Sequence, residues 1–567
     1  MLVVQEKFSS YLKMLRELLS ETDFLIHQER LQQVLHAELL VPVIGAFSAG
    51  KSTLLNAFIE IDILPVGIAP ETELATELRY SPEPYVLAVK KDGSEERHSI
   101  DALIDINKRS AEYLFVRLFI NSPVLKDIVP LVLVDMPGYG SSLENHNKAL
   151  SYYLPKGVHF IVVTSIEDGN ITRAIIGQLE EAQEYGGDFT FVISKSNLRA
   201  PEQIEDVRRY INEQIATYFS AGHQAVPVGD KDVKILFEEI KKVDSEKLFS
   251  GIYLPLLKNE NNELLNNVIL AMNVIRRDAR ESEKDLQELE KAMNYLLDKK
   301  ADAEQETRSR YSRRLLDSAL KSVDHALNNA VDELTMLAIN RNNRNTFENH
   351  VSEIIRSSLA KTFKREGNDI SAAMIDGLTK EISIAFPDMP HALTIGEDLH
   401  KKILIQSDKV STWLEQKKKL LSQGAGEEER ENEPKGKDFL LTLINIAEIT
   451  DPIISALILF LPDVLALFQK QAVKKRAREN LVQEVFPNIK ASLRNVLAQE
   501  IDERLNNMLA GIAAEFEVAI GEKRQVIENY QKAKKENSAK ENDQLSRLEN
   551  LYKSIESLAE QYLSERP

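Results

Sequence analysis

Hydrophobic residues follow two different spacings along this chain, and the spacing changes between residues 245 and 255. Before this point, short apolar runs of strand type alternate with segments in which apolar residues recur at helical spacing. Such alternation predicts an α/β domain in which helices cover a mainly parallel sheet. After this point the strand signals vanish and only the helical spacing remains. We therefore expect long helices that pack on one another.

The α/β region contains several candidate strands and helices. The strands are expected at 39–44, 84–91, 113–120, 130–135, 158–164 and 188–194. The helices are expected at 51–59, 172–185 and 202–219. An amphipathic helical region at 3–36 leads into this domain, because its apolar residues recur at helical spacing.

Two apolar stripes mark the helical part of the chain. One consists of Leu286, Leu289, Met293, Leu296 and Leu297. The other follows an a/d heptad pattern through Leu545, Leu548, Tyr552, Ile555, Ala559 and Tyr562. An apolar stripe that faces water is unfavourable. We therefore expect the two ends of the chain, 3–36 and 541–563, to pack together beside the α/β domain.

The segments 422–437 and 438–478 have opposite characters. The first is charged, holds no large apolar side chain and predicts a mobile linker. The second holds two uncharged runs, each shorter than the ~20 residues that a transmembrane helix needs. We expect an apolar helical tip with a basic flank that lies within one membrane leaflet; a buried helical core is the alternative. The residues expected at the membrane are Ile453, Ile454, Leu457, Ile458, Phe460, Leu461, Lys474, Lys475 and Arg476.

Composition narrows the class of protein. The 567 residues exceed what one hydrophobic core serves, so two to four domains are expected. The absence of cysteine excludes disulfides and thiolate metal sites, and the charged segment Met1–Lys7 does not resemble a signal peptide. Both features favour a cytoplasmic protein. A net charge of −18 argues against a nucleic-acid partner, because binding to phosphates needs a basic face.

The segment Gly45–Thr53, G-A-F-S-A-G-K-S-T, carries the most specific motif of the chain. Its spacing, G-x-x-x-x-G-K-S, is typical of a loop whose backbone N–H groups surround a phosphate chain. An apolar strand precedes the segment and a helix follows it, which is the setting that such a loop requires. The candidate nucleotide contacts are Gly45, Ala46, Phe47, Ser48, Ala49, Gly50, Lys51, Ser52 and Thr53.

A phosphate loop needs partners for Mg²⁺ and for the γ-phosphate. Lys51 is expected to neutralise the β- and γ-phosphate oxygens, and the hydroxyl of Ser52 to bind Mg²⁺. Asp135 ends an apolar strand within D-M-P-G, so its carboxylate can hold Mg²⁺ through water. In the same motif, Gly138 can offer its N–H to the γ-phosphate.

A loop rich in proline and glycine, 64–72, lies between these two motifs. Its threonine, Thr72, is well placed in the sequence to close on Mg²⁺ and the γ-phosphate. We therefore expect Thr72 to be a metal ligand, with Thr76 as the alternative.

Base recognition is expected in the turn after the strand at 188–194. Ser194, Lys195 and Asn197 form S-K-S-N, which resembles the N/T-K-x-D motif that reads guanine. An aspartate at the last position accepts two hydrogen bonds from guanine, whereas Asn197 has only one acceptor oxygen. This loss weakens selectivity for guanine by about 1–3 kcal/mol. Guanine is still favoured over adenine.

In their order, G-A-F-S-A-G-K-S-T, L-P-V-G-I-A-P-E-T, D-M-P-G and S-K-S-N resemble the motifs of the dynamin superfamily. The resemblance is to the bacterial dynamin-like proteins, in particular the toxin-associated LeoA type. It implies a P-loop GTPase head, a helical neck and trunk, and a membrane-binding paddle. It also implies that Ser48 stabilises the transferring phosphoryl group. Phe47 departs from the family, because eukaryotic relatives often have glutamine there. The catalytic residues are then Ser48, Lys51, Thr72 and Gly138.

The resemblance also implies a domain organisation and a set of partners. The domains are a neck helix at 1–36, a dynamin-type GTPase domain at 37–250, a neck and trunk at 251–421, a linker at 422–437, a paddle-like hairpin at 438–478 and returning helices at 479–567. The ligands are GTP, GDP and Mg²⁺. The partners are a second GTPase head, other dynamin-like proteins and anionic membrane lipids, to which a cytoplasmic protein attaches peripherally.

Three functions fit these features. The first is a mechanochemical GTPase that self-associates and acts on membranes. The second is a nucleotide-gated scaffold with little hydrolysis, whose apolar tip docks a partner protein. The third is a regulatory ATPase, which requires the turn at 194–197 to read adenine.

Overall fold

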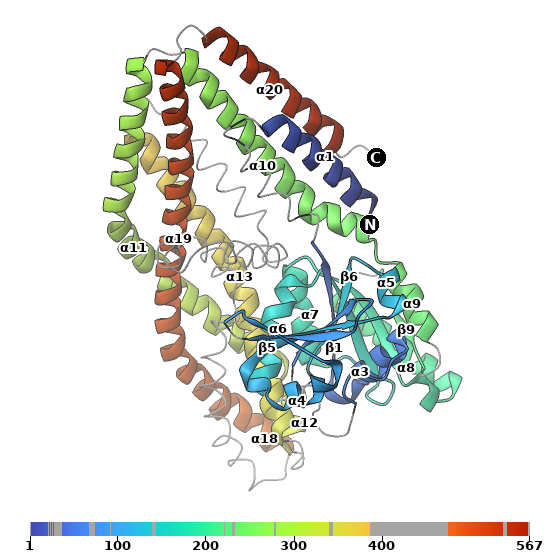
Figure 1. Cartoon of the computed structure of the whole chain (residues 1–567). Coiled ribbons are helices and arrows are strands. Elements are labelled where there is room, and N and C mark those ends of the chain that lie inside the picture. Colours follow the sequence, from blue (N-terminus) through green and yellow to red (C-terminus); the bar gives the residue numbers. More distant parts are fainter. Residues whose placement is uncertain are drawn as a thin grey trace.

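The computed structural model describes an α/β domain and a set of long helices (Figure 1). The described residues are 2–20, 22, 24, 27, 34, 37–66, 74–90, 92–138, 143–219, 222–229, 233–276, 279–339, 344–385, 474–536 and 541–564. The strands are β1 (Leu39–Gly45), β2 (Thr76–Tyr80), β3 (Tyr85–Lys90), β4 (Glu95–His98), β5 (Tyr113–Ile120), β6 (Leu131–Asp135), β7 (His159–Ser165), β8 (Asp188–Ser194) and β9 (Ala225–Pro227).

The helices differ in length between the two parts of the chain. Those of the α/β domain are α3 (Lys51–Ile59), α4 (Leu103–Lys108), α5 (Pro123–Asp127), α6 (Leu143–Lys156), α7 (Arg173–Glu184), α8 (Pro201–Tyr218) and α9 (Val233–Lys241). The others are α1 (Val3–Leu19), α10 (Ser245–Arg276), α11 (Ala279–Asn329), α12 (Val331–Ile339), α13 (Arg344–Ala385), α18 (Lys474–Asn480), α19 (Phe486–Glu536) and α20 (Glu541–Tyr562).

The strands form one nine-stranded sheet in the order β4-β3-β5-β2-β6-β1-β7-β8-β9. β1 lies between β6 and β7, is parallel to both, and is buried along its whole length. An apolar run that is buried on both faces is the pattern of a central parallel strand. The predicted fold class is confirmed, because a mainly parallel α/β domain is joined to long helices.

Three short strands, β2, β4 and β9, are not predicted by the spacing of hydrophobic residues. β2 carries the buried Glu77 and the half-buried Arg79, and Arg79 pairs with both Glu77 and Glu38. β4 is a polar strand at the edge of the sheet, and β9 has only three residues. Hydrophobic spacing cannot detect a strand whose buried charges neutralise one another or whose side chains face water.

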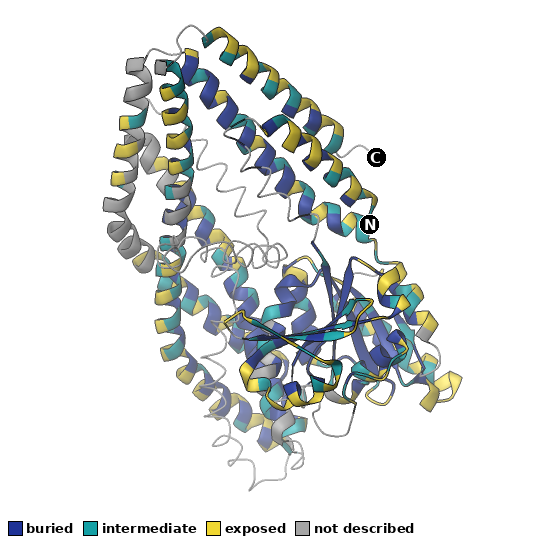
Figure 2. Cartoon of the chain, viewed as in Figure 1, coloured by how far each residue is buried: buried dark blue, intermediate teal, exposed yellow. Residues whose placement is uncertain are grey.

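Both faces of the sheet are covered by helices (Figure 2). One hydrophobic core lies between the sheet and α6, α7 and α8. The core on the other face continues into α1, α10 and α20. Tyr11 of α1 donates a hydrogen bond to Asn261 of α10, and Tyr562 Oη of α20 lies 3.3 Å from Met14 Sδ of α1. The prediction that the two chain ends pack together is confirmed.

A second helical core holds α11, α12, α13 and α19 together, and we call these four helices the trunk. Along α19, buried apolar residues recur at helical spacing from Phe486 to Ile527. Leu286, the first residue of the predicted stripe in α11, packs partly buried against this core. The side chains of the other four, Leu289, Met293, Leu296 and Leu297, lie outside the described residues.

The α/β domain meets the trunk through a polar contact between α7 and α13. A Cβ on Gly177 of α7 would lie only 2.7 Å from Ser357 Oγ of α13, so the two helices approach closely. Arg356 of α13 is 0% exposed and donates to the carboxylates of Glu181 on α7 and Glu353 on α13 at 2.7 to 3.1 Å. Burial raises the pKa of Glu181 to about 7, although Arg356 opposes the shift. This contact therefore depends on a cation that is fully withdrawn from water.

The expected linker at 422–437 lies outside the described residues, as does most of the hairpin expected at 438–478. The undescribed residues of this prediction include Ile453, Ile454, Leu457, Ile458, Phe460 and Leu461. Of the basic flank, Lys475 and Arg476 are exposed on α18, and the side chain of Lys474 is outside the described set. Among the helices that the structure describes, none has the length and apolar character needed to cross a membrane.

Removing the cation at position 356 is expected to loosen the contact between α7 and α13. Arg356→Met leaves Glu181 and Glu353 buried without their partner, which costs about 3–5 kcal/mol. We expect faster amide hydrogen exchange in α7 and α13 of the intact chain, and unchanged exchange in α3. Lys361→Met is the matched control, because it removes only the partly exposed pair with Glu180. Unchanged exchange in α7 of Arg356→Met would contradict this account of the contact.

The packing of the two chain ends can be tested with introduced thiols, because the chain has no cysteine. We expect Met14→Cys with Tyr562→Cys to crosslink through a short bismaleimide, since the native side chains of these residues touch. Met14→Cys with Met336→Cys is the control, because Met336 is exposed on α12 in the trunk. The readout is an electrophoretic shift of the monomer. A crosslink in the control pair, or none in the test pair, would contradict the observed packing.

Candidate functional site

The segment between β1 and α3 forms a tight loop at the edge of the sheet where β1 ends. A Cβ on Gly45 would lie 2.2 Å from the carbonyl oxygen of Val163 on β7, so only glycine fits there. Gly50 caps α3 with a φ of 81°, in the left-handed region that favours glycine. The two glycines of the motif thus bring the loop directly to the N-terminus of α3. The N–H groups at the N-terminus of a helix suit an anion.

Lys51 bends back over this loop. Its Nζ donates to the carbonyl oxygens of Gly45 and Ala46, both at 3.0 Å, and only 5% of the residue is exposed. Burial lowers the pKa of Lys51 to about 8, and the charge of Asp135 opposes the shift. At neutral pH Lys51 therefore keeps its proton. The loop has the buried positive charge that a phosphate chain needs.

Ser52 and Asp135 join the start of α3 to the end of β6. Ser52 Oγ donates to Asp135 Oδ2 at 2.7 Å. Within the described part of the chain, Asp135 Oδ1 is buried and has no hydrogen-bond partner. Burial raises the pKa of Asp135 to about 6, against the effects of Ser52 and Lys51. A hydroxyl and a carboxylate with an unused oxygen are ligands that Mg²⁺ prefers, so Ser52 and Asp135 fit the expected metal site.

The loop after β6 is anchored by a histidine that the sequence did not single out. His146 of α6 donates from Nδ1 to the carbonyl oxygen of Pro137 at 2.9 Å, next to the buried Gly138. Burial lowers the pKa of His146 to about 4, so the ring is neutral. Glu353 and Arg356 at the trunk contact act on the same ring electrostatically. A single histidine in a helix belongs to no motif, and only the fold reveals its position.

The turn after β8 lies against the phosphate loop. Ser194 Oγ donates to the carbonyl oxygen of Ala49 at 2.5 Å, so this side chain ties the turn to the loop backbone. Lys195 has a φ of 56°, and its Cε lies 3.7 Å from the position of a Cβ on Gly50. The stem of Lys195 therefore covers the start of α3. Asn197 is exposed in the same turn.

The other predicted residues are distributed unevenly. Ser48 and Thr53 are exposed on the loop and on α3, and the side chain of Phe47 is outside the described set. Thr72 also lies outside the described residues. Thr76 is buried at the start of β2, opposite Asp135, and its hydroxyl donates to the carbonyl oxygen of Leu74 at 3.4 Å. The hydroxyl of Thr76 is thus engaged with the backbone of its own segment.

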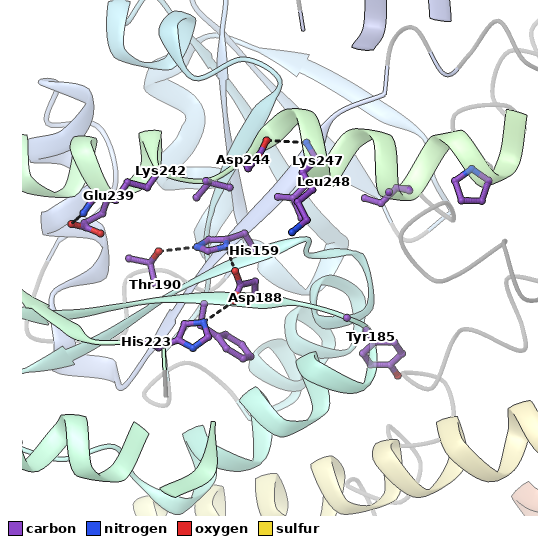
Figure 3. Close-up of a pocket in the computed structure, with 17 residues that line it drawn as sticks. His159, Tyr185, Asp188, Thr190, His223, Glu239, Lys242, Asp244, Lys247 and Leu248 are labelled. Atoms are coloured by element: carbon purple, nitrogen blue, oxygen red, sulfur yellow. Dashed lines mark hydrogen bonds and ion pairs between the residues drawn. The ribbon is translucent and has the colours of Figure 1, made fainter. Parts of the chain in front are cut away.

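A separate cavity of about 820 Å³ lies where β7 and β8 begin, at the opposite edge of the sheet (Figure 3). There Asp188 Oδ1 lies 2.7 Å from His223 Nε2, and Asp188 Oδ2 lies 3.9 Å from His159 Nδ1. Lys242 lines the same cavity and pairs with Glu239. Among the described residues, no three or more His, Cys, Asp or Glu side chains are arranged to hold a metal ion. This cavity contains none of the residues that the sequence motifs single out, so the phosphate loop is the stronger candidate site.

Comparison with known proteins supports the same location. Residues 41–197 match the family model described as the dynamin family. A protein of the xynA 3′ region of Caldicellulosiruptor sp. (strain Rt8B.4) is 29% identical over 194 residues, which cover 32% of this chain and 46% of that protein. Dynamin-like protein 2 of Campylobacter jejuni (strain 81-176) is 27% identical over 199 residues, which cover 34% of this chain and 31% of that protein. The chain thus matches less than half of the length of these relatives.

A solved structure of an oligomerised bacterial dynamin pair, described as sensing and tethering membranes, resembles the whole chain only loosely. The match covers 96% of this chain and 94% of the solved chain, with 15% sequence identity and a TM-score of 0.30. The family model, in contrast, includes the loop at 45–52, Asp135 and the turn at 194–197. Residues 41–197 of this chain therefore form a domain of the dynamin family.

Proposed function

We propose that this chain is a dynamin-like GTPase that binds and hydrolyses GTP with Mg²⁺. In this proposal, nucleotide turnover drives self-association through the head and the binding or remodelling of membranes. The observation that carries the proposal is the contact of Ser52 with Asp135 beside the buried Lys51. These three residues all lie within the segment that matches the dynamin family.

Phosphoryl transfer to water depends on positioning and charge neutralisation, and it needs no covalent intermediate. Lys51 is the cation for the β- and γ-phosphates, because its Nζ already lies over the loop backbone. Mg²⁺, when bound, neutralises charge on the same oxygens. Ser52 and Asp135 orient that ion, and the buried Oδ1 of Asp135 is the oxygen available for its water shell.

Three more residues complete the proposed machinery. Gly138 offers its N–H to the γ-phosphate, Ser48 stabilises the transferring phosphoryl group, and Thr72 closes on the metal. Support for Gly138 comes from its place in a loop that His146 anchors through the carbonyl group of Pro137. Ser48 is supported by its exposure on the phosphate loop. Thr72 is supported by the sequence motif alone.

The membrane part of the proposal concerns the hairpin at 438–478. Its apolar residues gather in one short segment, and a basic stretch follows them. Lys475 and Arg476 are exposed on α18, while Arg478 of the same helix pairs with Asp332 of α12. Exposed cations next to an apolar segment suit the surface of an anionic membrane. On this proposal, the protein is cytoplasmic and attaches peripherally to a membrane.

A nucleotide-gated scaffold is the second candidate function. The departure at Phe47, where relatives often have glutamine, favours slow hydrolysis over fast turnover. The departure at Asn197 removes a charged acceptor for the base. Tight binding of nucleotide without turnover, with or without membranes, would favour this candidate.

Removal of the cation at position 51 is expected to abolish nucleotide binding. Lys51→Ala should weaken binding of a non-hydrolysable GTP analogue with Mg²⁺ by about a hundredfold or more, because charge-assisted hydrogen bonds to the phosphates are lost. Isothermal titration calorimetry on the intact chain measures this change. Lys108→Ala is the control, since Lys108 is an exposed residue of α4 that pairs with Asp105. Unchanged affinity of Lys51→Ala would exclude the loop from nucleotide binding.

Membrane binding is expected to depend on the apolar hairpin. Each apolar side chain that leaves water contributes roughly 1.5–3 kcal/mol, so Leu457→Asp with Phe460→Asp should eliminate cosedimentation with anionic liposomes. The wild-type chain should bind these liposomes less as salt is added, because the basic flank contributes.

Two controls separate a membrane site from a buried core. The double variant is expected to keep the helicity, the melting transition and the GTP binding of the wild-type chain. Unfolding of the variant would assign the hairpin to a core. A folded variant that still sediments with liposomes would place the membrane site elsewhere in the chain.

A further inference from the structure

The turns that follow β7 and β8 lie side by side. The strands are parallel neighbours with Ser165 opposite Ser194, and the N–H of Ile166 donates to the carbonyl oxygen of Ser194 at 3.0 Å. The residues that follow Ile166 are Glu167 and Asp168. The register of the sheet thus places the turn that carries Glu167 and Asp168 next to Lys195, the residue whose stem covers the phosphate loop.

One of the two carboxylates is engaged by Lys195. Lys195 Nζ donates to Glu167 Oε2 at 3.3 Å. The neighbouring carboxylate, Asp168, is exposed and lies within the field of the same cation. Its protein surroundings raise its pKa by desolvation, and the charge of Lys195 opposes this shift. The N–H groups of Asp168 and Gly169 both donate to the carbonyl oxygen of Ser165 at 3.1 Å, and Gly169 has a φ of 65°. These contacts fix the backbone of Asp168 beside the turn that carries Lys195.

The side chain that a nucleotide site needs beside the base depends on which base it binds. Guanine presents two neighbouring donors, N1–H and the 2-amino group, and a carboxylate accepts both. Xanthine has a carbonyl at position 2 in place of the amino group, so an amide that can both accept and donate suits xanthine. A site read by Asn197 alone would therefore favour xanthine over guanine.

We propose that Asp168 is the specificity-determining residue that accepts the N1–H and 2-amino hydrogen bonds of guanine, in place of the aspartate that position 197 lacks. The proposal rests on the proposed GTPase function and assigns the residue that selects guanine. In this arrangement Glu167 holds Lys195 along the phosphate loop, and Asp168 is the carboxylate that reads the base. Asn197 then has no role in choosing guanine over xanthine.

The test compares the affinities of fluorescent GDP and XDP analogues, in Mg²⁺ buffer, for the wild-type chain and three variants. We expect the wild-type chain to bind GDP more tightly than XDP. Asp168→Asn should weaken GDP binding by about tenfold or more and strengthen XDP binding, because the amide donates to the 2-carbonyl of xanthine. Glu167→Gln removes the same charge one residue away and should leave the ratio of the two affinities unchanged. Circular dichroism verifies that each variant is folded.

Each other outcome has a distinct meaning. A wild-type preference for XDP, or an unchanged ratio in Asp168→Asn, would overturn the proposal and leave nucleotide binding intact. A gain in GDP affinity of about tenfold in Asn197→Asp, with an unchanged ratio of GDP to XDP affinity in Asp168→Asn, would assign recognition of the base to position 197. Binding of neither nucleotide to the wild-type chain would overturn the proposed GTPase function as well.

Discussion

The position of β1 between two parallel neighbours is the constraint on which the site depends. Because β1, β6 and β7 run in the same direction, they end at one edge of the sheet. At this edge, Gly45 lies against the carbonyl group of Val163, and Asp135 accepts a hydrogen bond from Ser52. One strand further, β8 brings Ser194 to the backbone of the loop. A phosphate loop, an oxygen pair for a metal and a turn beside them thus follow from strand order.

The same domain is held by two different kinds of contact. On one face, its apolar core continues into α1, α10 and α20, so these three helices extend the domain's own interior. On the other, α7 meets α13 through charge and small side chains. A polar contact between parts of one chain separates at a lower cost than an apolar core. His146 lies near this contact and also holds the loop that follows Asp135, so the nucleotide site and the trunk contact share a neighbour.

The sequence predicts the parts of this structure that depend on apolar periodicity and on backbone motifs. The strands at 39–44 and 130–135 and the loop between β1 and α3 are found where they are expected. Sequence spacing misses β2, because the buried carboxylate of Glu77 is paired with Arg79 and Arg117. It also misses Arg356, since a single arginine on a long amphipathic helix gives no sign that two carboxylates will surround it. Contacts between charges far apart in the chain depend on the fold, which local patterns do not encode.

The central proposal is that this site hydrolyses GTP and that hydrolysis is coupled to the binding of membranes. Phosphate release from GTP by the intact chain, with Mg²⁺ and with or without liposomes of anionic lipid, tests the claim most directly. We predict release that stops when EDTA removes Mg²⁺ and that increases when liposomes are added. Release no greater than that of the Lys51→Ala chain under both conditions, or release that liposomes leave unchanged, would contradict the account.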